Sequence, residues 1–194
     1  MVHDIASRLR PSMCRALPFF HALSGCDTTS QLLRVGKKTA RDRRSSMPEI
    51  TQAFISLTAR PESFTFKSQD MRLLERFCIL MYSKSSSSVS LNDTRPQMFS
   101  NGSQTLENLP PTTAAYYQHV SRSILQSCYV WKQSLLPRQV ISNYADWGWK
   151  YDEKQEADCH TGPLWRMLAQ LVSSLKDVDA KWHAKGTVNV LKPI

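Results

Sequence analysis

Apolar side chains recur at three- and four-residue steps along most of this 194-residue chain, which is the spacing of helices with one buried face. The clearest stretch is 69–82, where Ser68 can cap the first turn. We predict a mainly α-helical protein, with Pro18 in the first turn of its first helix and Thr112 capping its longest helix. The predicted helices span 18–23, 28–33, 37–44, 48–57, 69–82, 113–135 and 164–182, and 187–191 is a predicted short strand.

Residues 83–111 interrupt this pattern. Ser85, Ser86, Ser87 and Ser88 form a serine run, and the remainder is rich in Asn, Gly, Thr and Pro. We predict a long loop with at most one helical turn near 96–99, and a structural break within it. The predicted organisation is a helical segment over 1–82, a linker over 83–111 and an appended helical region over 112–194.

Two long apolar stripes lie in the appended region, over 113–135 and 164–182. Stripes of this kind usually pack against other helices of the same chain. A helical protein partner is the alternative, although a coiled coil would need more sustained heptads.

Positive charge is concentrated near the N-terminal end. The whole chain carries a formal net charge of +9, and residues 1–60 hold ten Lys and Arg against four acids. Six of these cations fall within 34–44, where Asp42 is the one acid. Clustered positive charge favours polyanionic partners such as nucleic acid. The alternative is a solvated helix face that keeps the protein soluble.

The chain lacks the usual marks of a membrane or secreted protein. No apolar run approaches the roughly 20 residues that cross a bilayer, and the N-terminus has no basic-then-apolar signal pattern. Five cysteines at wide spacing, without a Cys-x-x-Cys pair, fit a reducing compartment. We therefore expect an intracellular protein without a membrane partner, and a nuclear location is compatible with its charge.

The first candidate for chemistry is Asp27. It follows Gly25 and Cys26 at the end of an apolar helix, so its carboxylate is expected at a sharp, exposed turn. Carboxylate oxygens are ligands that Mg²⁺ prefers. Two-metal phosphodiester hydrolysis needs several acids, and one Asp cannot supply them. The alternative is that Asp27 caps a short helix over 28–33.

The second candidate is the turn that opens the basic helix, Val35-Gly36-Lys37-Lys38-Thr39-Ala40. A glycine at a helix start lets a ligand approach the backbone, and the first N–H groups of a helix bind phosphate oxygens. The pattern is not a Walker A loop. An ordinary turn before a basic helix is the alternative. The candidate nucleic-acid-binding residues are Arg34, Gly36, Lys37, Lys38, Thr39, Arg41, Arg43 and Arg44.

Together, Gly25-Cys26-Asp27-Thr28 and Gly36-Lys37-Lys38-Thr39-Ala40 resemble the flap-endonuclease branch of the PIN-like nucleases. In that family a Gly-Ser/Cys-Asp turn carries a metal-binding carboxylate, and a Gly-x-Gly-x-x-x-Ala turn holds the DNA backbone. The resemblance implies that Asp27 is a catalytic metal ligand for Mg²⁺ and that the Gly36 turn binds DNA in preference to RNA. It covers residues 17–44, and Arg34 stands where the family's first turn glycine is expected.

The whole chain also resembles the C-terminal part of a group of uncharacterised, multi-copy animal proteins, whose abundance suggests mobile-element ancestry. The shared segments appear here as Phe20–Thr28, Leu74–Tyr82 and Leu109–Trp149. By the nuclease resemblance, a central sheet and further acids would precede Asp27.

These resemblances define the expected function. Residues 1–82 are expected to be the helical C-terminal part of a PIN/flap-endonuclease-like domain. We expect a nuclease-derived, catalytically incomplete chain that binds the nucleic-acid backbone. The alternatives are a Mg²⁺-dependent nuclease completed by absent residues or another chain, and a helical protein–protein interaction module.

Overall fold

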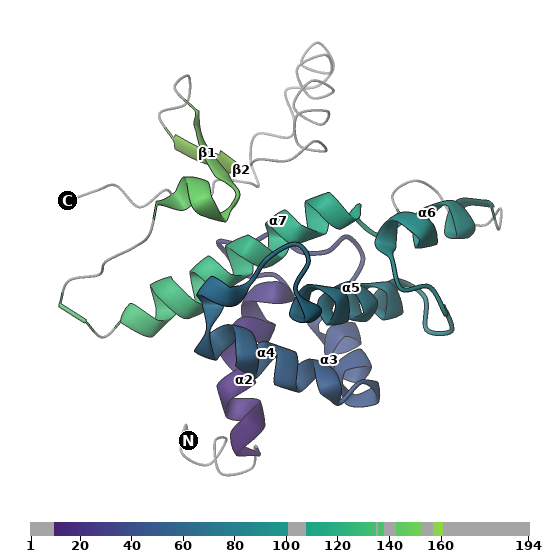
Figure 1. Ribbon diagram of the computed structural model, residues 1–194, viewed down its shortest axis with the longest axis horizontal. Helices are drawn as coiled ribbons and strands as arrows, with labels where there is room; N and C mark the ends of the chain where they lie inside the picture. Colours follow the sequence, from purple (N-terminus) through teal and green to yellow (C-terminus); the bar gives the residue numbers. More distant parts are fainter. Residues whose placement is uncertain (1–9, 101–107, 135, 138–142, 153–156, 161–194) are drawn as a thin grey trace, which may run out of the picture.

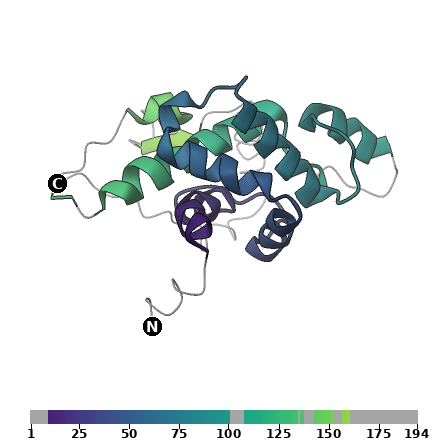
Figure 2. The same ribbon diagram turned by 60° about the horizontal axis from the view of Figure 1, so that its bottom comes forward.

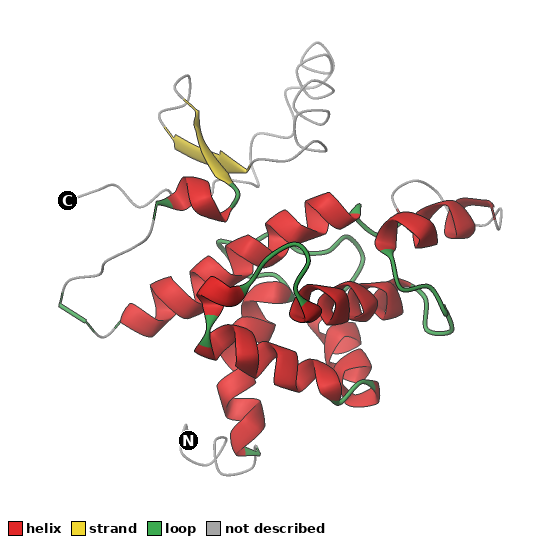
Figure 3. Cartoon of the chain, in the orientation of Figure 1, coloured by secondary structure: helices red, strands yellow, loops and turns green. Residues whose placement is uncertain are grey.

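The computed structural model describes residues 10–100, 108–134, 136–137, 143–152 and 157–160, and of residues 150–152 and 157–160 it describes the backbone only. Within these residues the protein is mainly helical, as predicted (Figures 1 and 3). The α-helices are α2 (Pro11–Leu23), α3 (Lys37–Ser46), α4 (Glu49–Ala59), α5 (Gln69–Tyr82), α6 (Leu91–Ser100) and α7 (Thr113–Ile124). A π-helical turn (Leu125–Val130) and a 3-10 turn (Trp131–Gln133) extend α7, and further 3-10 turns span Pro61–Ser63 and Tyr144–Trp147. Strands β1 (Trp149–Asp152) and β2 (Ala157–His160) form an antiparallel pair.

The core is built around Phe54 of α4. Its ring centroid lies 5.3 Å from that of Phe19, 6.1 Å from that of Phe20 and 5.8 Å from that of Phe77. The rings of α2 and α5 therefore meet on α4, which packs against both helices. In Figure 2, α2 and α3 lie along the same side of α4.

Helix α7, which follows residues 83–111 in the sequence, packs into the same core. Val120 and Ile124 are fully buried and Cys128 is 4% exposed, all in one cluster with the phenylalanines. The apolar stripe of α7 is thus used inside the chain, as the packing interpretation predicted. Within the described residues, segments 10–82 and 112–134 share one hydrophobic core, so the segment 83–111 does not separate two cores there. The division into a helical segment, a linker and an appended region stays a prediction.

The two helix starts predicted from the capping residues Ser68 and Thr112 are confirmed. Ser68 Oγ accepts from the Met71 N–H at 3.2 Å, and α5 has the predicted bounds. Thr112 Oγ1 accepts from the Ala115 N–H at 3.2 Å, and α7 starts where predicted. The predicted stripe at 164–182 and the strand at 187–191 lie outside the described residues.

Two predictions about the first helices are wrong. Helix α2 starts at Pro11, which occupies the first turn, and Pro18 lies inside the helix. A proline costs one intrahelical hydrogen bond, and the buried Phe19 and Phe20 beside it offset that cost by packing. The predicted helix over 28–33 does not form, because Thr29 pairs with Cys26 in a tight turn instead.

The prediction of at most one helical turn near 96–99 is also wrong, because the longer helix α6 forms over Leu91–Ser100 with Pro96 inside it. Leu91 and Thr94 are no more than 1% exposed, so this helix is held by packing that its weak local signals do not reveal. No helix within the described residues combines the length and the apolar character needed to span a bilayer. Among the described cysteines, Cys26, Cys78 and Cys128 are free thiols.

A buried carboxyl group ties α5 to the two helices that follow it. Glu75 is 9% exposed, and its Oε1 accepts from the Leu91 N–H at 2.7 Å and from Thr113 Oγ1 at 2.5 Å. Leu91 and Thr113 open α6 and α7, where backbone N–H groups lack intrahelical acceptors. Glu75 therefore sets where both helices begin relative to α5.

We expect Glu75→Ala to lower the free energy of unfolding by about 2–4 kcal/mol, because two buried donors lose their acceptor. Glu75→Gln keeps an acceptor oxygen of the same shape and should cost about 1 kcal/mol. Urea unfolding followed by far-UV circular dichroism measures both values. Equal losses for the two variants would contradict a hydrogen-bonding role for Glu75.

Candidate nucleic-acid interface

The C-terminal end of α2 is held by donors from several other parts of the chain. The last carbonyls of a helix have no intrahelical partner. Here Thr29 Oγ1 donates to the Ala22 carbonyl at 2.7 Å, and His119 of α7 contacts the Leu23 carbonyl through Nε2 at 2.8 Å. A carbonyl only accepts, so Nε2 carries the hydrogen, and Nδ1 lies 3.1 Å from Ser30 Oγ.

Lys37 completes this cap from the first turn of α3. Its Nζ donates to the Gly25 carbonyl, to Ser24 Oγ at 3.2 Å and to the His21 carbonyl at 3.4 Å. An ammonium at the negative end of a helix dipole is also favourable electrostatically. Lys37, a predicted phosphate ligand, therefore has acceptors within the protein for its three N–H groups and joins α3 to α2.

Gly25 makes the chain reversal after α2 possible. Its φ is +97°, and a Cβ added there would lie 2.9 Å from the Cα and Cβ atoms of Gln31. Both the backbone conformation and the contact with Gln31 require glycine.

Asp27 lies at the exposed tip of the turn that follows. Cys26 and Thr29 exchange two backbone hydrogen bonds of 3.3 Å, with Asp27 and Thr28 between them. The predicted exposed turn is confirmed. The alternative, that Asp27 caps a helix over 28–33, is wrong because residues 28–33 are not helical.

The surroundings of Asp27 do not by themselves build a magnesium site. Among the described residues, no three His, Cys, Asp or Glu side chains are grouped so that they could hold a metal ion. Mg²⁺ prefers several oxygen ligands, of which Asp27 could supply one. Metal binding and catalysis by Asp27 stay predictions.

Two titratable groups beside this turn are perturbed. Burial, followed by the charge of Lys37, lowers the pKa of His21, against an opposing effect of Asp27. Burial alone would raise the pKa of the Cys26 thiol, but hydrogen bonds from the side chains and backbones of Thr28 and Thr29 lower it overall. His21, Asp27 and Lys37 therefore act on one another electrostatically.

The start of α3 is open to solvent. Gly36 precedes the helix with a φ of −83°, and no side chain among the described residues caps the first turn. A Cβ added to Gly36 would meet no atom within 4 Å. The small Thr39 and Ala40 follow, and Ala40 is 2% exposed where α3 packs against the rest of the protein. A phosphate-binding turn and an ordinary turn before a basic helix share this geometry, so phosphate binding at Gly36 stays a prediction.

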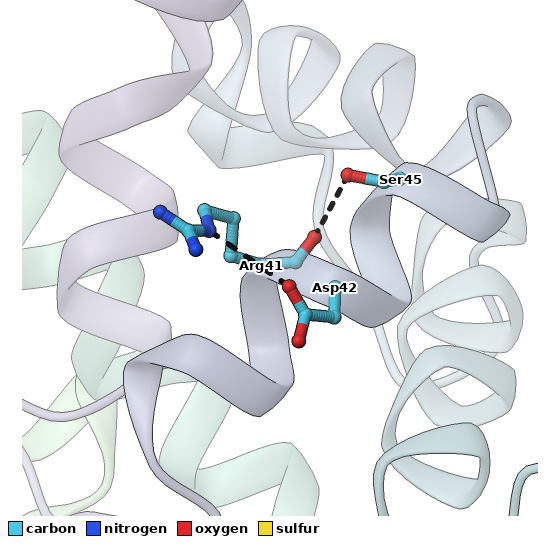
Figure 4. Close-up of polar contacts among 3 residues, drawn as sticks. All are labelled: Arg41, Asp42 and Ser45. Carbon is cyan, nitrogen blue, oxygen red and sulfur yellow. Dashed lines mark hydrogen bonds and ion pairs between the residues drawn. The ribbon is translucent and has the colours of Figure 1, made fainter.

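The cations of α3 differ in their freedom to reach a ligand. Lys38 is exposed, and the Arg41 side chain is 65% exposed but lies 3.9 Å from the carboxylate of Asp42 (Figure 4). Ser45 Oγ also donates to the Arg41 carbonyl. The Nε atoms of Arg43 and Arg44 are buried without a partner in the described structure, so only the ends of these guanidinium groups can reach solvent.

Arg34 has a backbone conformation that favours glycine. Its φ is +60°, and every other non-glycine residue in the described part of the chain has a negative φ. This is the position where the resemblance to PIN-like nucleases expects the first turn glycine.

Sequence reasoning missed the residues that hold this site together. His119 lies 96 positions from Leu23, and no local pattern links the two. Thr29 and Ser24 were likewise not among the predicted site residues.

Comparison with models of protein families, with curated proteins and with solved structures finds no match for this chain. The candidate site therefore stands on its own geometry.

We expect Gly25→Ala to lower the free energy of unfolding by at least about 2 kcal/mol, because it combines a left-handed backbone with a close contact. Gly36→Ala is the matched control and should cost no more than about 1 kcal/mol, since its backbone suits alanine and its surroundings are open. Denaturant unfolding of the two variants measures the difference. A larger loss for Gly36→Ala would mean that the turn conformations are assigned incorrectly.

Proposed function

We propose that this chain binds the sugar-phosphate backbone of nucleic acid at the first turn of α3. The observation that carries the proposal is the open start of that helix, where Gly36 leaves space and Lys38 stands exposed. Backbone N–H groups at a helix start and nearby cations together favour a phosphate.

The proposal gives each predicted binding residue a distinct role. The N–H groups of the first turn, from Lys37 to Thr39, face the phosphate, and Lys38 and Arg41 supply the mobile positive charge. Lys37 positions the turn through its contacts with the end of α2. Arg34, Arg43 and Arg44 add to the local potential. Such contacts read no base sequence, so binding is expected to be backbone-directed.

DNA is the ligand we propose first, because the resemblance to PIN-like nucleases implies it. A metal-dependent nuclease completed by further residues or by another chain is a second candidate, favoured by the exposed carboxylate of Asp27 at the tip of its turn. Mg²⁺- or Mn²⁺-dependent cleavage that Asp27→Asn abolishes would support it. An unaffected cleavage rate in that variant would exclude Asp27 from catalysis.

We expect the double variant Lys38→Ala/Arg41→Ala to weaken DNA binding and to reduce the slope of log K against log salt by about 1–2, since each lost phosphate contact contributes about 0.9. Fluorescence anisotropy with a labelled duplex across a salt series measures both. Arg60→Ala/Lys67→Ala removes two exposed cations outside α3 and is the matched control. An equal change in the control would attribute binding to net charge, and absence of binding at low salt would refute the proposal.

Asp42→Asn should strengthen DNA binding by about two- to fivefold at low salt, because the carboxylate that neutralises Arg41 is removed. The gain should disappear at high salt. Glu62→Gln, at an exposed acid outside α3, controls for the change in net charge. If both variants gain equally, Arg41 is not part of the binding surface.

A further inference from the structure

An aromatic pair stands beside the proposed phosphate site. The ring centroids of His21 and Trp131 are 5.4 Å apart, with the ring planes inclined by 32°. His21 is exposed on the last turns of α2, and Trp131 is half-buried in the 3-10 turn that extends α7. Two helical segments that are far apart in the sequence thus bring their aromatic rings into contact at the surface.

The pair lies next to the first turn of α3. Lys37 of that turn donates to the backbone carbonyl of His21 at 3.4 Å, and its charge acts on the His21 ring. A ligand whose phosphate occupies the start of α3 would therefore have its neighbouring groups close to His21. The charge of Asp27 also acts on the His21 ring.

The chain places Trp131 at this surface by interrupting α7. Trp131 lies three residues after the buried Cys128, which is the spacing of one apolar stripe in a regular α-helix. Here a π-helical turn over Leu125–Val130 precedes Trp131, and the Trp131 ring contacts that of His21. π-helical turns inside helices occur frequently at functional sites.

We propose that His21 and Trp131 form a stacking platform for an unpaired nucleobase, so that the preferred ligand is single-stranded or contains an unpaired nucleotide next to the phosphate at α3. This inference rests on the proposed function. Bases stack on aromatic side chains with about 1–3 kcal/mol per base and with little sequence preference. Burial and the charge of Lys37 lower the pKa of His21, which favours the neutral form of the ring, and a neutral ring suits stacking.

The test compares oligo(dT) with a blunt duplex that has the same number of phosphates, at one salt concentration. Trp131→Leu keeps apolar packing but removes the aromatic face, and should weaken oligo(dT) binding about five- to 150-fold, which is 1–3 kcal/mol converted at 1.4 kcal/mol per tenfold. Duplex binding should change less than twofold. Trp131→Phe keeps a ring face and should retain most of the oligo(dT) affinity.

Further variants keep the test decisive. If Trp131→Leu fails to fold, His21→Gln replaces it, because His21 is exposed, and it should selectively weaken oligo(dT) binding too. Phe66→Leu is the matched control at an exposed aromatic that packs on Tyr117, and should change neither affinity. Wild-type oligo(dT) affinity in both Trp131→Leu and His21→Gln would overturn the platform. That result would leave backbone binding intact if Lys38→Ala/Arg41→Ala still weakens binding to both DNAs.

Discussion

The rest of the structure depends on how the free carbonyl groups at the end of α2 are satisfied. The carbonyls of His21, Ala22 and Leu23 accept from Lys37, Thr29 and His119, and these donors belong to α3, the intervening loop and α7. Leaving the buried carbonyls of Ala22 and Leu23 without donors would cost more than the bonds themselves contribute. The same contacts that satisfy one helix end therefore bring three segments of the chain together.

This constraint limits which cations of α3 remain available to a ligand. Along the sequence, six cations face one acid between residues 34 and 44. In the folded chain Lys37 is bonded to α2, Arg41 is paired with Asp42, and Arg43 and Arg44 are partly covered. What remains is a narrow surface at the start of the helix, flanked by an aromatic pair. This arrangement supports the proposed contact with a phosphate at the start of α3 and with its adjoining nucleotide.

Local signals predicted those helices whose first turn contains its own capping residue, as Ser68 and Thr112 show. They failed where packing decides. Helix α6 has no strong apolar pattern and forms because Leu91 is buried and bonded to Glu75, while 28–33 has plausible helical spacing but is held in a turn by Thr29. At the site, the exposed turn of Asp27 and the open Gly36 were predictable, since glycine and turn residues act locally.

The sequence by itself determined that the protein is mainly helical, where its best-capped helices begin, and where its basic residues concentrate. These properties follow from the spacing of apolar residues and from interactions within one helical turn. Only the tertiary structure decided which cations reach solvent and which donors bond the last carbonyls of α2. It alone also places the ring of His21 against that of Trp131. The physical reason is that a hydrogen bond or ring contact between residues as far apart as Leu23 and His119 depends on how the helices pack, and it leaves no periodic trace in the sequence.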